Sequence, residues 1–417
     1  MNVELTAEIS DIEREWKSDR WNGIARPYTA EEVCRLRGSI RIDHAFARLS
    51  AEKLWDMLHS EQHILAHCAP TGGRAVQMVR SGLRTIYFHG RRAVPDGVPP
   101  ARIEHACDNV FPGMESEMIH AIGRALLRAD QLNGAAADGK VDWLAPIIAD
   151  VDSGAGHSMP IYESSSEMIE AGAAGLHFED MVSVGRANAY VDWRALVPTS
   201  QFIGNLVAAR LASDVMGVPT VLIAKTAARN ATLLTSDIDE RDARYATGER
   251  TELGHCWIRS SLETAIERAL SLAPFADMVS FESSDPDIDE ARHFSEAVLS
   301  EYPGKPLAYS CSAAPGWVEG MSKDDVTAFN ERLSRMGYRL QIIAGNGFTS
   351  TNDIVSRQYG EFAQEGVPVG QETRKHLMNQ EQHANLTIGG LNTSCSSYFD
   401  EVSRIISRAA PQFTFTL

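Results

Sequence analysis

The sequence of 417 residues lacks several features that would assign it to a particular class of protein. No apolar run approaches the roughly 18 residues of a membrane-spanning helix, and the charged N-terminal stretch has no apolar segment typical of a secretion signal. Lys and Arg number 39 against 56 Asp and Glu, which gives a formal net charge of −17. This balance argues against nucleic acid or an anionic membrane as a partner. We therefore expect a cytoplasmic protein that binds neither.

Several short motifs are also absent. The six cysteines contain no CxxC pair, so the sequence predicts neither a zinc knuckle nor a redox motif, and the thiols are expected to be reduced. The sequence has no GxSxG, GxxxxGK[ST] or HExxH motif, which leaves the corresponding nucleophile, phosphate and zinc sites without support. Gly345-Asn-Gly347 lacks the third glycine of a dinucleotide-binding loop.

What the sequence does contain is a recurring alternation of β-rich and helical segments. Eight short runs are mostly apolar throughout, as in parallel strands that are buried on both faces. They lie at about 64–68, 84–88, 145–149, 174–178, 219–224, 277–281, 306–311 and 339–344. Helical patterns separate most of them, the clearest at 199–216. The pattern predicts an α/β fold, a (β/α)8 barrel of the TIM type, while a doubly wound open sheet stays open as the alternative.

The expected barrel divides the chain into three parts. Residues 1–60 form an N-terminal helical extension, residues 61–350 form the barrel, and residues 351–417 form a C-terminal helical region. Two connections within the barrel, near 89–143 and 226–260, are long enough to be functional loops or small insertions.

Acidic residues follow several of the expected strands, at the end of a barrel where enzymes place their chemistry. Asp150 and Asp152 follow the third strand, Glu179 follows the fourth, Glu282 follows the sixth, and Asp108 lies in the long second connection. Carboxylates that converge repel one another unless a cation lies among them, and hard oxygen ligands favour Mg²⁺ or Mn²⁺. The alternative is that these carboxylates cap helices or are solvated in loops. Three histidines, His89, His157 and His177, also lie near strand ends, where a structural role is the commoner one.

Longer stretches carry a more specific signal. They are WNGIARPYTAEEVCRLRGS (21–39), AGAAGLHFED (171–180), LVAARLASDVMGVPT (206–220), LTSD (234–237), TGERT (247–251), YPGKPLAY (302–309) and YFD (398–400). In this order, and over nearly the whole chain, they resemble the isocitrate lyase family. The resemblance implies a Mg²⁺-dependent (β/α)8 barrel, a homotetramer with C-terminal helices exchanged between subunits, and cleavage of isocitrate to glyoxylate and succinate. Mn²⁺ is the alternative ion.

The resemblance also assigns residues. It places the metal shell on Asp108, Asp150, Asp152 and Glu179. Asp152 stands where the family's ADAEAG run has Glu, so its carboxylate reaches one methylene less far and a water is expected to fill the gap.

The sequence departs from the family where substrate is contacted. The family's mobile loop, Lys-Lys-Cys-Gly-His-Met, aligns with GRANAY at 185–190, so methyl groups replace a thiol and an imidazole that transfer protons. The family's Ser-Gly-Trp becomes His-Gly-Arg at 89–91, and an Arg becomes Lys, which loses the bidentate fork. We expect replacement substrate contacts at Gly90, Arg91, Arg186, Lys225, Ser310 and Ser312. We expect proton transfer by Tyr190, His89 or His157.

Two functions are consistent with these changes. The first is a divergent Mg²⁺-dependent carbon–carbon lyase of the oxo-acid-lyase type, whose small carboxylate substrate is a 2-hydroxy or 2-oxo acid other than isocitrate. The second is a catalytically silent isocitrate lyase paralogue that serves as a binding or regulatory subunit, since loss of selection would leave such Cys→Ala and His→Ala replacements. The intact set of four carboxylates favours the enzyme.

Overall fold

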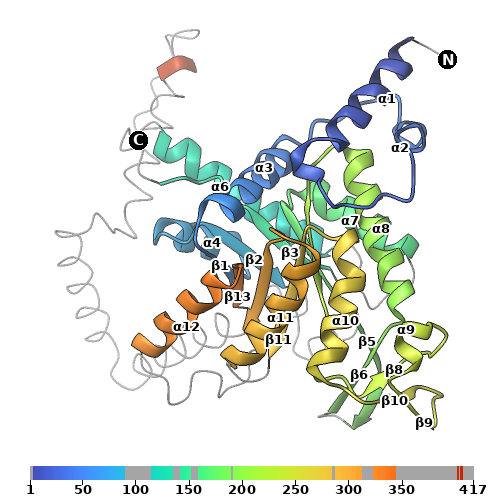
Figure 1. Cartoon of the computed structure of the whole chain (residues 1–417). Helices are drawn as coiled ribbons and strands as arrows, with labels where there is room; N and C mark the ends of the chain where they lie inside the picture. Colours follow the sequence, from blue (N-terminus) through green and yellow to red (C-terminus); the bar gives the residue numbers. More distant parts are fainter. Residues whose placement is uncertain are drawn as a thin grey trace.

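The computed structural model describes residues 3–89, 114–134, 141–151, 158–188, 191–283, 287–311, 323–343, 402 and 404–406. Within these ranges, eight parallel strands close into a barrel in the order β1-β13-β12-β11-β7-β4-β3-β2 (Figure 1). The strands are β1 (Ile64–Cys68), β2 (Thr85–His89), β3 (Ile147–Val151), β4 (Gly175–Glu179), β7 (Val221–Lys225), β11 (Met278–Ser283), β12 (Leu307–Cys311) and β13 (Tyr338–Ile343). The predicted (β/α)8 barrel is confirmed, and the open sheet is excluded because β1 pairs with both β2 and β13.

Helices surround the barrel and precede it. The surrounding helices are α4 (Gly72–Arg80), α6 (Met114–Gly134), α7 (Ser158–Ala171), α8 (Thr199–Met216), α10 (Leu262–Leu272), with η4 (Ala273–Phe275) after it, α11 (Ile288–Glu301) and α12 (Lys323–Arg335). Ahead of β1 lie α1 (Val3–Trp16), η1 (Asp19–Trp21), α2 (Ala30–Leu36) and α3 (Ala45–Ser60). Among the described residues, no helix combines the length and the apolar character that crossing a membrane would require. The expected C-terminal helical region, 351–417, lies outside the described residues except for 402 and 404–406.

The barrel wall is apolar on both sides, as the continuous hydrophobic runs predict. Leu176 and Phe178 of β4 and Leu222 of β7 are fully buried, and burying each such side chain contributes roughly 1.5–3 kcal/mol. Helix α3 packs closely on the same wall. A Cβ at Gly175 would lie 3.2 Å from Leu54 Cδ2 and 3.2 Å from Val221 O, so a side chain at this position would push α3 away from the strand.

A second, five-stranded sheet flanks the barrel. Its order is β5-β6-β8-β10-β9, formed by β5 (Met181–Asn188), β6 (Val191–Leu196), β8 (Leu233–Leu234), β10 (Cys256–Ile258) and β9 (Ala246–Arg250), with α9 (Glu240–Ala243) before β9. The insertion near 226–260 thus joins the hairpin after β4, at one end of the molecule (Figure 1). Hydrophobic periodicity did not predict this sheet, because β8 and β10 are very short and β9 is mostly exposed.

Buried ion pairs attach the N-terminal extension to the barrel. Asp277, just ahead of β11, accepts hydrogen bonds from Arg20 (2.7 Å), from Arg210 of α8 and from the backbone N–H of Leu222 (2.7 Å). The guanidinium of Arg20 also lies 3.8 Å from the ring centroid of Trp55. Because each charge has a partner, this interior position is tolerated, and removing one partner would leave an unpaired buried charge.

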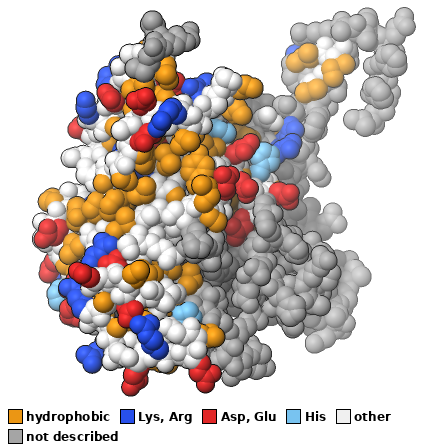
Figure 2. Space-filling model, turned by 90° about the vertical axis from the view of Figure 1, so that its right-hand side faces the viewer, with side chains coloured by type: hydrophobic (Ala, Val, Ile, Leu, Met, Phe, Trp, Pro, Cys, Tyr) orange, Lys and Arg blue, Asp and Glu red, His pale blue; other side chains and the backbone are white. Residues whose placement is uncertain are grey.

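Some apolar side chains stay exposed on the surface of the protein. In the view of Figure 2, charged side chains gather at the upper and lower ends of the face, and hydrophobic side chains form a band between them. Ile40 and Ile42, between α2 and α3, are among the large hydrophobic side chains that stay exposed, at 82% and 65%. Such exposed apolar groups are typical of protein–protein contacts when they are contiguous.

Candidate active site

Polar side chains gather at the C-terminal ends of the barrel strands. The strand register brings them together, because His89 on β2 pairs with Asp150 on β3, Asp150 pairs with His177 on β4, and Glu179 pairs with Lys225 on β7. Glu282 on β11 stands opposite Ser310 on β12 in the same way. The C-terminal face is where characterised enzymes with this fold carry their active sites.

Two imidazoles hold the carboxylate of Asp150. His89 Nδ1 contacts Oδ2, and His177 Nδ1 lies 3.2 Å from Oδ1. Burial alone would raise the pKa of Asp150, but the fields and hydrogen bonds of His89 and His177 outweigh it and hold that pKa well below its usual range. Asp150 is therefore an anion at neutral pH, as a metal ligand must be.

The two ring nitrogens of His177 differ, because Nδ1 has two partners and Nε2 has none among the described residues. Tyr87 Oη lies 3.1 Å from the same Nδ1 that contacts Asp150, whereas Nε2 is buried and has no hydrogen-bond partner among the described residues. A buried ring nitrogen without a partner is costly. This nitrogen therefore marks a place where a bound ligand or water would be stabilised.

Lys225 lies between two carboxylates. Its Nζ is 3.2 Å from Glu179 Oε1 and 2.7 Å from Glu282 Oε2. Burial lowers the pKa of Lys225, but the charges of Glu179 and Glu282 outweigh burial and raise that pKa above its ordinary value. Lys225 is thus an ammonium ion that orients two site carboxylates. Beside it, Ser310 Oγ lies 3.0 Å from Ser280 Oγ in the barrel interior.

Asp180, the next acidic residue along the chain, has a structural role. Its carboxylate accepts hydrogen bonds from Thr226 Oγ1 (2.7 Å), Ala227 N (2.8 Å) and Arg268 Nε (2.9 Å), and Asp180 is fully buried. The alternative reading of strand-end carboxylates as structural groups is thus correct for Asp180, which lies beside Glu179 in sequence but outside the site.

The donor set suits a hard cation. Asp150 and Glu179 supply carboxylate oxygens from adjacent strands, the ligand type that Mg²⁺ prefers. Within the described ranges, no group of three His, Cys, Asp or Glu side chains is arranged to hold a metal ion. The other two expected ligands, Asp108 and Asp152, lie outside those ranges. The described half of the shell therefore fits Mg²⁺ in chemistry, with His89, His177 and Lys225 beside the anionic oxygens.

The remaining candidate residues divide into two groups. Arg186 lies on β5, where it pairs in register with Asp192 of β6. The others lie outside the residues that the structure describes: Gly90, Arg91, His157, Tyr190 and Ser312. Sequence analysis did not include Tyr87 or His177 in the site. In the sequence, His177 lies within an apolar strand, as structural histidines commonly do. Only its pairing with Asp150 across the sheet shows that it belongs to the site.

The fold and the site together define a class of protein, a (β/α)8 barrel with an acidic cluster at the C-terminal ends of its strands that Lys225 holds in place. The sequence profile of the isocitrate lyase family matches residues 8–93, 124–252 and 247–410. Isocitrate lyase from Halalkalibacterium halodurans is 38% identical over 398 residues, which cover 95% of this chain and 93% of that protein. Isocitrate lyase from Corynebacterium efficiens is 40% identical over 373 residues, covering 88% and 86%. The chain belongs to the isocitrate lyase family.

Solved structures with the same fold extend the comparison. A 2,3-dimethylmalate lyase of the PEP mutase/isocitrate lyase superfamily matches with a TM-score of 0.54 at 17% identity, covering 87% of this chain and 96% of that one. A phosphonopyruvate hydrolase in complex with oxalate and Mg²⁺ matches with a TM-score of 0.54 at 18% identity, covering 87% and 99%. At these identities the likeness concerns the fold.

Proposed function

We propose that the protein is a Mg²⁺-dependent lyase that cleaves a carbon–carbon bond in a 2-hydroxy or 2-oxo carboxylate other than isocitrate. The observation that carries the proposal is a contrast within one barrel mouth. Asp150 and Glu179 are held by cationic or imidazole neighbours, whereas the sequence resemblance implies that residues 89, 91, 225 and 310 differ from the substrate contacts of the family.

The retained carboxylates support metal binding. Asp150 and Glu179, with Asp108 and Asp152, would hold Mg²⁺, with Mn²⁺ as the alternative. The bound ion would supply Lewis-acid stabilisation of negative charge on a substrate carboxylate and the oxygen beside it. The oxalate and Mg²⁺ complex of the phosphonopyruvate hydrolase pairs the same kind of ion with a small dicarboxylate on a similar fold.

The residues around the carboxylates would position the substrate and its proton. The contact between His89 Nδ1 and Asp150 orients the imidazole, so proton exchange with a substrate would use its Nε2. Tyr190 and His157 are the other proposed proton donors. Lys225 would act mainly by holding Glu179 and Glu282 in place.

Substrate recognition is assigned to residues that lie at or near strand ends in the sequence, as the resemblance implies. Ser310 is already at the barrel interior beside Ser280, and Gly90, Arg91, Arg186 and Ser312 are the other proposed contacts. We also propose a homotetramer, for which the exposed Ile40 and Ile42 offer an apolar contact surface.

A catalytically silent paralogue is the second candidate. It is favoured by Ala187 and Ala189, which stand where the family has the thiol and the imidazole of its mobile loop. Methyl groups cannot transfer a proton. Such a subunit would bind a partner chain and turn over no carboxylate.

The two candidates are separated by following a panel of 2-hydroxy and 2-oxo acids by proton NMR, with purified protein and Mg²⁺. The lyase proposal expects Mg²⁺-dependent consumption of at least one acid, its loss in Asp150→Asn, and its retention in Glu13→Gln, which removes an exposed carboxylate on α1. If no acid is consumed by the wild-type protein and a homologous isocitrate lyase subunit is bound, the silent paralogue is the better account.

A further inference from the structure

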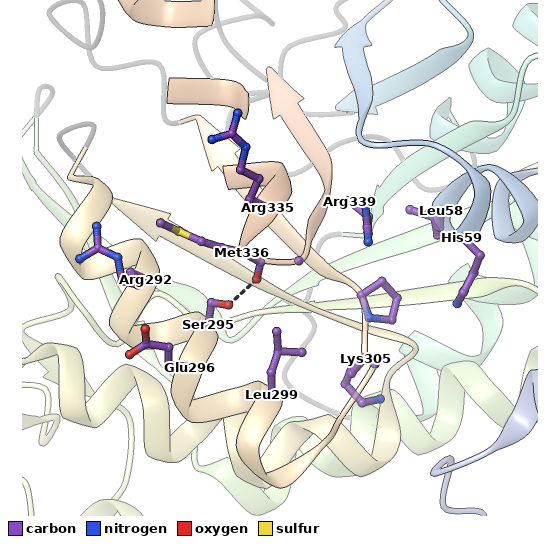
Figure 3. A pocket seen from close by; sticks show the side chains of 13 residues that line it. Leu58, His59, Arg292, Ser295, Glu296, Leu299, Lys305, Arg335, Met336 and Arg339 are labelled. Carbon is purple, nitrogen blue, oxygen red and sulfur yellow. Dashed lines mark hydrogen bonds between the residues drawn. The ribbon is translucent and has the colours of Figure 1, made fainter. Parts of the chain in front are cut away.

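A cavity lies at the end of the barrel opposite the candidate active site. It has a volume of 560 Å³ and lies beside the N-terminal ends of β12 and β13, lined by residues of α3, α11, α12 and the turns before those strands (Figure 3). Strands of five or six residues separate it from the carboxylates, a distance of roughly 15–20 Å. Its size falls in the usual range of small-molecule sites, about 300–1,000 Å³.

Positive charge dominates the lining. Four cationic side chains, together with His59, face a single carboxylate, that of Glu296. The four are Arg292, Lys305, Arg335 and Arg339. In Figure 3, Arg339, His59 and Lys305 lie on one side of the cavity, and Arg292 and Glu296 lie on the other. Such a lining is unusual in a chain whose formal net charge is −17, because only one acidic side chain lines the cavity beside four basic ones.

Two of the cations bond only to backbone carbonyl groups. Arg339 Nη1 donates to Gln62 O at 3.1 Å and to Glu61 O at 3.4 Å, and Lys305 Nζ donates to Ala276 O at 2.8 Å. Among the described residues, neither side chain is within ion-pair distance of a carboxylate. Carbonyl dipoles orient these cations but do not neutralise them.

The other two arginines have only weak partners. Arg292 pairs with Asp289 and Arg335 pairs with Glu331, each within one helix and at exposed positions. Exposed pairs of this type contribute about 0–1 kcal/mol, so both guanidiniums can turn toward a ligand at small cost.

Lys305 is partly buried. Burial is the main cause that lowers its pKa to about 8; the charge of Asp277 opposes this shift, and the positive charges of Arg210 and Arg20 add to it. An anion in the cavity would stabilise the ammonium form. The apolar part of the lining, which includes Leu299 and Met336, would pack against carbon atoms of an anionic ligand.

We propose that this cavity is a binding site for a small molecule that carries a phosphate group, with Arg339 and Lys305 as the principal contacts. Free phosphate and a phosphate ester share this chemistry. The ester would also use the apolar part of the lining, so the two sources differ in affinity.

Titration calorimetry with inorganic phosphate and with phenyl phosphate tests the proposal on the full chain. We expect both to bind at concentrations up to about 10 mM, and phenyl phosphate to bind more tightly if the natural ligand is an ester. Arg339→Gln and Lys305→Gln should each weaken binding by roughly 10- to 100-fold, since each removes a charge-assisted hydrogen bond.

Arg332→Gln is the matched control, because it removes the same charge from the exposed side of α12 and does not line the cavity. It should leave binding unchanged. Thermal melting identifies any variant that fails to fold, and Lys305→Gln decides the question if Arg339→Gln does not fold. Absence of binding by both probes, or equal binding by wild type and all three variants, would overturn the proposal.

Discussion

Asp150 is the residue on which the site depends most. Its carboxylate is held in the ionised state by His89 and His177. The other described carboxylate of the proposed metal site, Glu179, forms an ion pair with Lys225. His89 and His177 thus keep Asp150 charged, and Lys225 orients Glu179; these two carboxylates are the proposed Mg²⁺ ligands among the described residues. Neighbours of this kind commonly tune metal affinity by 10- to 100-fold.

Removing the charge of Asp150 is expected to abolish Mg²⁺ binding. Asp150→Asn keeps the shape of the side chain but loses an anionic oxygen ligand, so calorimetric titration should detect no Mg²⁺ or Mn²⁺ binding to the folded variant. Asp142→Asn, which changes an exposed carboxylate paired with Lys53, should bind as the wild type does. If the wild-type protein binds neither ion, with or without an oxo acid present, the metal assignment is wrong.

Arg91 is the residue most directly tied to the changed substrate. It stands where the family has Trp in Ser-Gly-Trp, next to Gly90, in a part of the chain that the structure does not describe. We expect it to pair with a substrate carboxylate, so Arg91→Ala should weaken ligand binding by about 1.5–3 kcal/mol.

The neighbouring residue supplies the control for this prediction. Arg92→Ala removes an equal charge one position along, on a side chain with no proposed role, and should change binding little. Equal and negligible effects of the two substitutions, measured by calorimetry with the acid that the enzyme consumes, would show that Arg91 is only a surface residue.

At the scale of elements, the strands were predictable and the small sheet was not. Apolar runs marked all eight barrel strands because both faces of those strands are buried. The third strand begins at Ile147, two residues later than the run at 145–149, since Pro146 has no N–H to donate to a ladder. The strands β8 (Leu233–Leu234) and β10 (Cys256–Ile258) are very short, and β9 is mostly exposed, and such segments carry little hydrophobic periodicity.

The site was predictable in part for a related reason. Strand ends and resemblance pointed to Asp150 and Glu179, because a barrel places strand ends together. The contacts of His177 and Lys225 depend on register between strands that are distant in sequence. No local pattern encodes that register, so the imidazole at Asp150 and the carboxylate partners of Lys225 became visible only in the fold.

Asp277 is one of the groups that attach the N-terminal extension to the barrel. Burial raises the pKa of Asp277, but Arg20 and Arg210 outweigh it and hold that pKa below its usual range. A carboxylate with a lowered pKa stabilises the fold fully above the unfolded-state value of about 3.9 and loses this contribution as the pH falls through its folded-state value.

Asp277→Asn should therefore lower the free energy of unfolding by about 3–5 kcal/mol, since two buried guanidiniums lose their counter-ion. The free energy of unfolding of this variant should also depend less on pH than that of the wild type. Urea unfolding between about pH 3 and pH 6 should show stability that falls with acidity more steeply in the wild type than in the variant. An exposed substitution, Asp11→Asn, should follow the wild type, and parallel curves for Asp277→Asn would contradict the role given to this network.

At the scale of the whole molecule, we propose that scaffold and chemistry have diverged to different degrees. The chain matches the isocitrate lyase family over most of its length, while the sequence resemblance implies that the positions proposed to contact substrate differ from those of the family. Random decay would be expected to alter both sets of residues. The contrast between a retained scaffold and changed substrate positions is what favours the proposal of a changed substrate.

The most direct test of this account is the steady-state rate of glyoxylate formation from isocitrate, measured with Mg²⁺ at high enzyme concentration. The resemblance places Ala187 and Ala189 where the family has a thiol and an imidazole, so proton transfer worth roughly 10²–10⁴-fold in rate is expected to be lost. The account predicts no turnover, or turnover at least about 100-fold below the range of about 1–10³ s⁻¹ that is ordinary for enzymes. Turnover of isocitrate within that range would contradict it, because the protein would then be a working isocitrate lyase with an unaltered substrate.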